Sequence, residues 1–445
     1  MLGHAFNRRE CRDAWGGSDG EGSDVKRIKI ESLQPGDIIL TARPGKGSKF
    51  IRGATGGMVS HAMICVQQGS FIDSTMDGVQ ARNIQREFFE DDENVFAFRL
   101  KTPLPTHVVT QVVDYARSQI GTRYSLREAA RSVVAVTKPR TNRLFCSRLV
   151  ARAYQSVGIQ LVGDQDYCSP EDLRISPLLV ELVLETEVVS QDEVEAMASR
   201  PNPIAMTHKA QNEVLDAARL LDPTVENFQD LDRLINDHPE WDDRIADVLQ
   251  STGYLDLWRY EVETHPWRYD HSVMATMTTP SIQQDLRAYC IGTVQEAYSG
   301  GVRFAVNLEH YRRRHQVSPR RSWQLLIELY ETLVSNDHCR REVARTWLAA
   351  AYPADLERHM EKIEPHSEMW FSIVDRVEPR LGALARLAIQ SEKSTMVCSS
   401  CGDGPITDYR IVNAAEAMPG VPSLRLCDDC VRIRRGFGER LEPLG

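Results

Sequence analysis

The chain has 445 residues, of which 26% are charged and 42% are hydrophobic, and its formal net charge is −10 at pH 7. This composition is typical of a globular protein of several domains and excludes a wholly disordered or collagen-like chain. The acidic balance argues against a general nucleic-acid-binding protein. No run of 18 uncharged apolar residues is present, so we predict no transmembrane segment.

The N-terminal region shows no apolar core and no cleavage site of a secretory signal. Residues 14–24 consist mainly of Gly, Ser, Asp and Glu, so we expect a flexible lead-in over residues 1–25. The ten cysteines are mostly scattered, unlike those of a short disulfide-rich secreted chain. We therefore expect a cytoplasmic location, with export by a route that needs no such signal as the alternative.

Residues 26–185 alternate between strand and helix patterns, which predicts a mixed domain of strands and helices. Apolar or alternating runs predict strands at 38–40, 60–66, 70–74 and 95–100. The second and third of these flank a Gln68-Gly69 turn and should form a hairpin. Apolar residues at helical spacing predict helices near 108–116 and over 144–158.

The next segment, residues 186–206, is acidic and then rich in proline, so we predict a linker. Residues 207–392 are predicted to form a helical domain of little evident function. Its candidate helices are 209–222, 224–236, 240–251, 281–298, 322–335 and 338–350.

Four cysteines form two tight pairs near the C-terminus, Cys398 with Cys401 and Cys427 with Cys430. Each CxxC turn presents two thiolates, and two such turns complete a tetrahedral shell that suits one structural zinc ion. An iron or iron–sulfur site, disulfides and free thiols are the alternatives. We therefore predict a zinc-ribbon-like domain over residues 393–445, in which metal binding supplies the folding free energy.

The basic stretch 432–435 follows the second cysteine pair. It could contact nucleic acid or another anionic partner, but the short length and the acidic remainder of the chain favour a solvated, charged chain end.

One cysteine outside this group is a candidate nucleophile. Cys146 precedes an apolar-periodic run, so it should lie in the first turn of a helix, where the macrodipole stabilises a thiolate. Such a thiolate needs a histidine, and His61 on a predicted strand is a better candidate than His107, which we expect in a loop after Pro103 and Pro105. Asp73 lies on the next strand of the hairpin, where it could orient the imidazole.

Two alternatives stand beside this interpretation. A buried cysteine is often an inert apolar residue, and Cys168, which precedes a Ser-Pro turn, is a second candidate nucleophile.

Six local patterns occur in an order that resembles a known family. They are Leu33–Leu40, Ser60–Ile64, Ile72–Asp73 with Gly78–Val79, Ile120–Tyr124, Phe145–Val150 and Ser169–Leu173. Together, over about residues 30–182, they resemble the circularly permuted NlpC-type papain-like cysteine hydrolases, in particular the YiiX/YebB-like group. In that family the strand histidine precedes the helix cysteine in the chain.

The resemblance implies that Cys146 is the nucleophile and His61 the general base. Asp73 occupies the position where the family usually has a glutamate or another polar residue, so Asp77 or a neighbouring side chain is an alternative third member. Asp37, in the Pro-Gly-Asp turn, is also typical of the family and is expected to make a turn or strand-edge hydrogen bond.

The expected fold class is therefore α+β, with a permuted papain-like domain of antiparallel sheet and helices over 26–185, an all-α region and a small zinc-binding unit. The implied activity is cleavage of an amide, ester or thioester through a thioacyl intermediate on Cys146, with a peptide or lipid acyl substrate. The alternatives are an acyltransferase of the same fold and a non-catalytic adaptor. Such an adaptor would bind a protein or nucleic-acid partner through the helical and zinc units.

Overall fold

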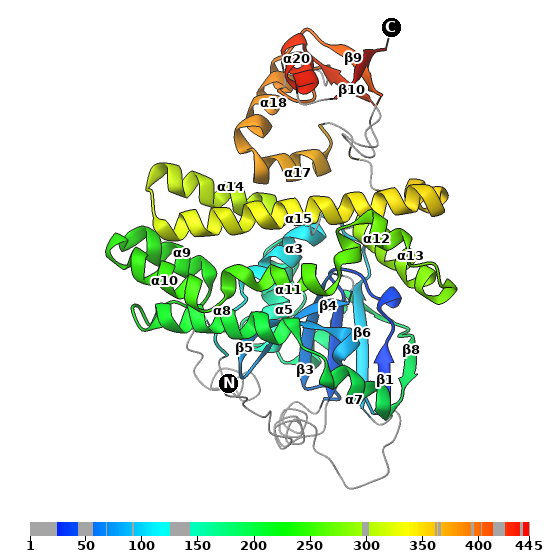
Figure 1. Ribbon diagram of the computed structural model, residues 1–445. Coiled ribbons are helices and arrows are strands. Elements are labelled where there is room, and N and C mark those ends of the chain that lie inside the picture. The colour runs from blue at the N-terminus through cyan, green and yellow to red at the C-terminus, as the bar shows by residue number, and fades with distance from the viewer. Residues whose placement is uncertain are drawn as a thin grey trace. The chain divides into compact units, whose positions relative to one another are not determined.

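The computed structural model describes residues 25–42, 57–67, 69–90, 93–124, 143–295, 302–360, 363, 366–392, 396–401, 403–412, 423–436 and 439–444. The chain divides into two compact units, Met1–Asp237 and His238–Gly445. The first is coloured blue to green and the second green to red in Figure 1. The protein is α+β, as predicted, with antiparallel sheets, many helices and a C-terminal cluster of four cysteines. All but the last residue of the expected lead-in 1–25 lies outside the described residues.

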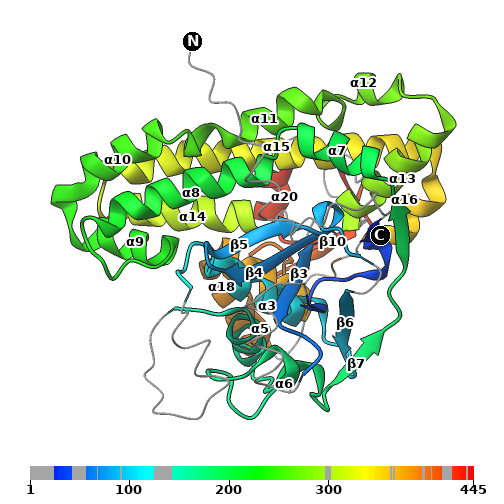
Figure 2. The same cartoon turned by 90° about the horizontal axis from the view of Figure 1, so that it is seen from below.

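The first unit is built on a six-stranded antiparallel sheet with the strand order β5-β4-β3-β2-β6-β7 (Figure 2). Its strands are β2 (Ile38–Ala42), β3 (His61–Gln67), β4 (Ser70–Thr75), β5 (Gly78–Asn83), β6 (Asn94–Leu100) and β7 (Leu179–Leu182). The predicted hairpin is confirmed as β3 and β4, with Met63 opposite Asp73. A tight turn then leads into β5, where Thr75 pairs with Gly78.

Both faces of this sheet are covered. Successive side chains of a strand point to opposite faces, so Ile38 and Leu40 belong to one apolar cluster and Ile39 to another. The first cluster includes the helices α3 (Thr106–Ser118) and α5 (Cys146–Gln155). Leu149, Val150 and Ala153 of α5 are fully buried there, and this packing fixes the start of the helix against the sheet.

The segment expected as a linker, residues 186–206, contains regular structure. It includes β8 (Thr186–Val189), which pairs with β1 (Val25–Ile28), and α7 (Gln191–Ser199). The first unit continues through α8 (Pro203–Arg219) and α9 (Phe228–Asp237). Helix α8 contacts the edge strand β5, as Figure 2 shows from below.

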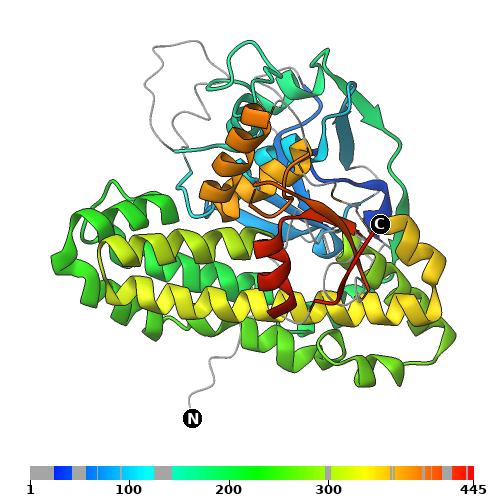
Figure 3. The same cartoon turned by 90° about the horizontal axis from the view of Figure 1, so that it is seen from above.

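The second unit begins with helices that pack around one long helix, α15 (Arg321–Ala351), seen in yellow in Figure 3. The other α-helices of this helical part are α10 (Asp242–Ser251), α11 (Leu257–Thr264), α12 (His271–Ala275), α13 (Pro280–Gln295), α14 (Val302–Val317), α16 (Pro353–His359), α17 (Glu368–Val377) and α18 (Pro379–Glu392). Asp242 accepts hydrogen bonds from the backbone N–H groups of Arg321 and Ser322 at 2.7 and 3.0 Å, and so caps α15. Among the described residues, no helix is both long and apolar enough to cross a bilayer.

The prediction of two helices at 322–335 and 338–350 is wrong, because α15 is continuous. Ser335, Asn336 and Asp337, near the expected break, have low intrinsic helix propensity. In the structure Asp337 pairs with Arg340 and Arg341, three and four residues later, at 3.0 and 2.8 Å. These ion pairs within one helix face support the helix where its intrinsic propensity is weak.

The C-terminal part holds a three-stranded antiparallel sheet and a helix. The strands are β9 (Thr407–Ile411), β10 (Ser423–Leu426) and β11 (Leu441–Pro443), in the order β10-β9-β11. Strands β9 and β10 lie between the two cysteine pairs in the chain, and β10 ends directly before Cys427. The basic stretch 432–435 lies in α20 (Asp428–Gly436), which starts directly after Cys427.

Candidate functional site

Cys146 is the first residue of α5, as the apolar periodicity predicts. The preceding residue, Phe145, is extended, and no side chain caps the helix. The backbone N–H groups of a first helical turn have no partner within the helix. The start of α5 therefore offers N–H donors and a positive dipole end beside the Cys146 thiol. Cys146 is only 5% exposed, so solvent reaches little of this residue.

His61 and Asp73 come from the neighbouring strands β3 and β4. Because Met63 pairs with Asp73, His61 is the diagonal neighbour of Asp73 on the same side of the hairpin. His61 Nε2 lies 2.9 Å from Asp73 Oδ2. The Asp73 side chain is only 3% exposed, whereas that of His61 is 27% exposed. The carboxylate is therefore buried behind an imidazole that solvent can still reach.

The structure also brings Cys146 and His61 together. Burial alone would lower the pKa of His61, but the charge of Cys146, the hydrogen bonds to Asp73 and Cys146, and the charge of Asp73 raise it to about 10. Since Nε2 faces Asp73, Nδ1 is the ring nitrogen left for the sulfur. A thiol, an imidazole and a carboxylate in this arrangement can act as a nucleophile, a base and an orienting group.

Arg82 on β5 is a neighbour that sequence reasoning missed. Its Nε donates to Asp73 Oδ1 at 2.9 Å, so both carboxylate oxygens of Asp73 are hydrogen-bonded. Burial raises the pKa of the Asp73 carboxyl, but His61 and Arg82 outweigh it and hold that pKa below its usual range. The sequence does contain a signal for this contact. If β4 and β5 are joined by a tight turn that pairs Thr75 with Gly78, Arg82 pairs with Phe71 and is the diagonal neighbour of Asp73.

The other sequence candidates lie elsewhere. Asp77 is exposed in the turn after β4, and the His61 hydrogen bond goes to Asp73. His107 was expected in a loop but lies in the first turn of α3, because Pro105 precedes the helix and starts it. Cys168 is buried, burial raises the pKa of its thiol, and its carbonyl accepts a bond of 2.7 Å from Ser147.

Tyr124 ends the Ile120–Tyr124 pattern and lies near Cys146. It forms an isolated parallel bridge with Leu144, two residues before Cys146. Burial and, after it, the negative charge of Cys146 raise the pKa of Tyr124. The chain at Tyr124 and Leu144 thus lies beside Cys146.

Asp37 makes the turn hydrogen bond that was expected of it. Its carboxylate accepts a bond of 2.7 Å from the backbone of Gln34 within the turn, and it binds both Nε and Nη2 of Arg99 at 2.7 Å. The Tyr154 hydroxyl on α5 donates to the carbonyl of Gly36 in the same turn. These bonds tie α5 to the sheet near the turn before β2.

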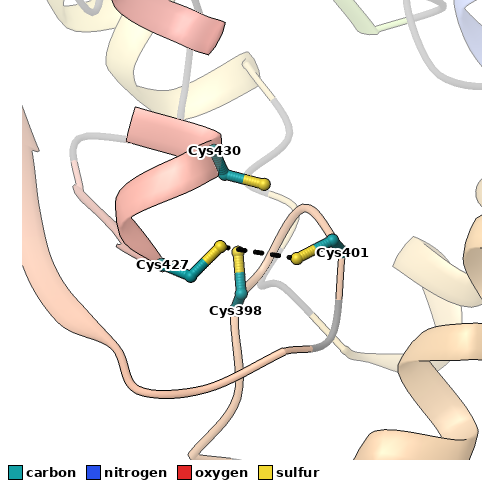
Figure 4. Close-up of side chains that lie close together, drawn as sticks. All are labelled: Cys398, Cys401, Cys427 and Cys430. Atoms are coloured by element: carbon teal, nitrogen blue, oxygen red, sulfur yellow. Dashed lines mark hydrogen bonds between the residues drawn. The ribbon is translucent and has the colours of Figure 1, made fainter. Parts of the chain in front are cut away.

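The four C-terminal cysteines form a separate candidate metal centre (Figure 4). Their sulfur atoms all lie within 4.8 Å of one another, and Cys401 Sγ is 3.5 Å from Cys427 Sγ. All four are free thiols rather than disulfides. Burial raises the pKa of Cys398, but hydrogen bonds from the backbone of Cys427, Cys401 and Ser400 outweigh it and lower this pKa. A metal ion could be held here by four protein ligands.

Part of the first unit is similar to known proteins. Residues 32–192 match the sequence model of a family described as "permuted papain-like amidase enzyme, YaeF/YiiX, C92 family". Among solved structures, the crystal structure of the metalloprotein YiiX from Escherichia coli O157:H7 is similar at 17% sequence identity and a TM-score of 0.29. That similarity covers 35% of this chain and 98% of the YiiX chain. No curated protein matches the chain.

The family match supports a permuted papain-like hydrolase segment. It spans less than half of the chain and includes Cys146, His61 and Asp73, and it ends before α8.

Proposed function

We propose that the first unit is a cysteine hydrolase that cleaves an amide, ester or thioester, with Cys146 as nucleophile. The observation that carries this proposal is the chain of contacts from Cys146 to His61 to Asp73, inside the segment that matches a family of amidases. A cysteine at a helix start lies beside a hairpin histidine that is bonded to a carboxylate, which is the order that thiol chemistry needs.

The proposed reaction runs in two steps. The Cys146 thiolate attacks the substrate carbonyl carbon, and the N–H groups at the start of α5 stabilise the oxyanion. His61, held as an imidazolium by Asp73, then gives its proton to the leaving group as the carbonyl–leaving-group bond breaks. A thioacyl group remains on Cys146. His61 takes a proton from water, which attacks the thioester carbonyl. The C–S bond then breaks, and the acid product leaves with the Cys146 thiolate and the His61 imidazolium restored.

The acceptor distinguishes hydrolase from acyltransferase. The partial exposure of the His61 side chain, 27%, allows water to reach the base, which supports hydrolysis. The substrate class we propose is a peptide or lipid that carries an acyl group.

For the second unit we propose one structural zinc ion at Cys398, Cys401, Cys427 and Cys430. Zn–S bonds of about 2.3 Å place sulfur atoms about 3.8 Å apart in a tetrahedron. The observed upper limit of 4.8 Å and the 3.5 Å pair suit such a shell. Four protein ligands leave no open position, so the ion would stabilise this part of the fold and take no part in the reaction at Cys146. Free thiols throughout the described chain suit a reducing compartment such as the cytoplasm.

The test compares the wild-type chain with Cys146→Ala and Cys168→Ala, using p-nitrophenyl ester and amide substrates at neutral pH. We expect turnover for the wild type and Cys168→Ala, and none above background for Cys146→Ala. Equal rates for wild type and Cys146→Ala would overturn the proposal. Adding an amine acceptor and identifying the product then separates transfer from hydrolysis.

A further inference from the structure

The segment from α8 to α9 follows the family-matched residues in the chain. Its side chains nevertheless contact residues 121–123 and Arg143, which flank the Tyr124–Leu144 bridge beside Cys146. We propose that Glu226 and its neighbours form a clamp that positions the Tyr124–Leu144 bridge and, through it, the start of α5. The effect on catalysis rests on the proposed function, but the clamp itself does not. Glu226 is thus assigned as a positioning residue that reaches the site from outside the matched segment.

The centre of the clamp is the Glu226 carboxylate. Its Oε2 accepts the backbone N–H of Arg123 at 3.1 Å and the Arg123 Nε at 2.9 Å. Its Oε1 accepts the Arg123 Nη2 at 2.6 Å, so one carboxylate holds both the main chain and the side chain of the residue before Tyr124. A planar guanidinium bound at two oxygens fixes direction as well as distance.

The same carboxylate reaches the other strand of the bridge. Arg143 Nε lies 3.6 Å from Glu226 Oε1, and Arg143 precedes Leu144, the bridge partner of Tyr124. Glu226 therefore contacts the residues flanking both members of the bridge. The Glu226 side chain is only 9% exposed, and Arg123 and Arg143 together lower its carboxyl pKa against the opposing effect of burial.

Three further contacts hold the turn that precedes Tyr124. Arg219 Nη2 donates to the carbonyl of Gly121 at 2.7 Å and to that of Glu226 at 2.8 Å. Asn227 Nδ2 donates to Thr122 Oγ1 at 3.3 Å. Leu215 of α8 packs against Gly121 so closely that a Cβ there would meet Leu215 Cδ1 at 2.1 Å.

The turn at residues 121–122 is also hydrogen-bonded to β5 of the six-stranded sheet. The backbone N–H of Val79 donates to Thr122 O, and that of Gly121 donates to Val79 O, each at 2.9 Å. Val79 follows Gly78 on β5, the strand that carries Arg82. The clamp therefore lies in a continuous set of contacts between the α8–α9 segment, β5 and the bridge that leads to Cys146.

The test uses the full chain and three variants: Glu226→Gln, Arg123→Lys and Glu213→Gln. Glu226→Gln removes the charge at nearly constant shape, and Arg123→Lys keeps the charge but loses the two-oxygen geometry. Glu213→Gln is the matched control, since Glu213 lies on α8 with a half-exposed side chain and makes only a 3.9 Å pair with Lys209. Circular dichroism confirms that each variant is folded.

Two readouts need no enzyme activity. Amide hydrogen exchange follows peptides covering 119–124 and 143–150, and iodoacetamide follows the alkylation rate of Cys146. We expect Glu226→Gln to speed exchange in both peptides and to change the alkylation rate about tenfold, since small misplacements at a reactive group have effects of this size or larger. Arg123→Lys should change both in the same direction, and Glu213→Gln should match the wild type.

The third readout is ester turnover. Glu226→Gln should lower kcat about tenfold with KM nearly unchanged, because the clamp orients reacting groups rather than binding substrate. If folded Glu226→Gln and Arg123→Lys match the wild type in exchange and alkylation, the clamp is wrong. If these two readouts change while the wild type itself turns over no ester or amide, the clamp stands and the proposed function fails. A Glu226→Gln chain that does not fold leaves Arg123→Lys to decide.

Discussion

His61 Nε2 lies 2.9 Å from Asp73 Oδ2, with His61 at the start of β3 and Asp73 near the middle of β4. This bond commits Nε2 to a buried carboxylate, so an interaction of the ring with Cys146 would use Nδ1. The charge of Cys146 and, after it, this bond to Asp73 raise the pKa of His61 although burial opposes them. The orientation of the imidazole is thus set by the diagonal pair of His61 on β3 and Asp73 on β4.

The first prediction concerns the orienting carboxylate. Asp73→Asn keeps the shape but removes the charge that stabilises the imidazolium and fixes its tautomer. We expect kcat on an activated ester to fall about 10²- to 10⁴-fold with a small change in KM. Steady-state kinetics measure this, with Asp77→Asn as the control because Asp77 is exposed in the neighbouring turn. A larger loss in Asp77→Asn than in Asp73→Asn would reverse the assignment of the third residue.

The second prediction concerns the ionisation of His61. Its pKa is raised to about 10 in the folded chain, from about 6.5 in an unfolded one. Its contribution to stability is therefore full below about pH 6.5 and is lost as pH rises through about 10. Urea unfolding of wild type and His61→Gln should show a stability difference that shrinks over this window.

An NMR titration of the His61 ring checks the same point directly. Cys146→Ala removes the negative charge of the sulfur, so the His61 pKa should fall in that variant. Ordinary titration of His61 near 6.5 in the wild type would contradict the interaction with Cys146.

The third prediction separates backbone strain from crowding. Gly121→Ala places a Cβ 2.1 Å from Leu215 at a φ of +92°, whereas Gly158, at +81°, has nothing within 4 Å. A left-handed conformation costs an alanine about 1–2 kcal/mol, so Gly158→Ala should lose about that much in unfolding free energy. Gly121→Ala should lose clearly more, and Gly163→Ala, free of both problems, should lose little. Thermal unfolding of the three variants gives the order, and equal losses at Gly121 and Gly158 would argue against close packing of α8 on the turn.

The fourth prediction concerns the cysteine cluster. Metal analysis of the purified chain should find one zinc per chain, and Cys430→Ser should lose it. Structural zinc contributes about 10–16 kcal/mol of binding free energy in small zinc-binding peptides. A chelator should therefore make residues 396–444 sensitive to proteolysis, whereas Cys339→Ser, outside the cluster, should retain the metal. Full zinc content in Cys430→Ser would exclude the four-cysteine site.

Local patterns were sufficient to predict much of this structure. The alternation at 60–66 and 70–74 gave the hairpin, and the apolar periodicity after Cys146 gave the helix that it starts. Two CxxC turns predicted the cysteine cluster, since their spacing alone brings pairs of thiols together. In each case the signal lies within a few residues of the feature.

Long-range partners were not predictable in the same way. Glu226 meets Arg123 across 103 positions, and nothing in the local sequence marks either as a partner. Asp337 illustrates the opposite failure, because its weak helix propensity is offset by Arg340 and Arg341 within the same helix. Arg82 lies between these cases, since correct counting across the β4–β5 turn places it beside Asp73.

The most direct test of the central claim is intact-mass spectrometry of the acid-quenched chain after brief mixing with a slowly hydrolysed p-nitrophenyl ester. The account predicts one added acyl group, located by peptide mapping to Cys146, absent from Cys146→Ala, and longer-lived in His61→Gln once formed by a high ester concentration. A wild-type chain that remains unmodified, or one that carries the acyl group at the same level in Cys146→Ala, would contradict the account.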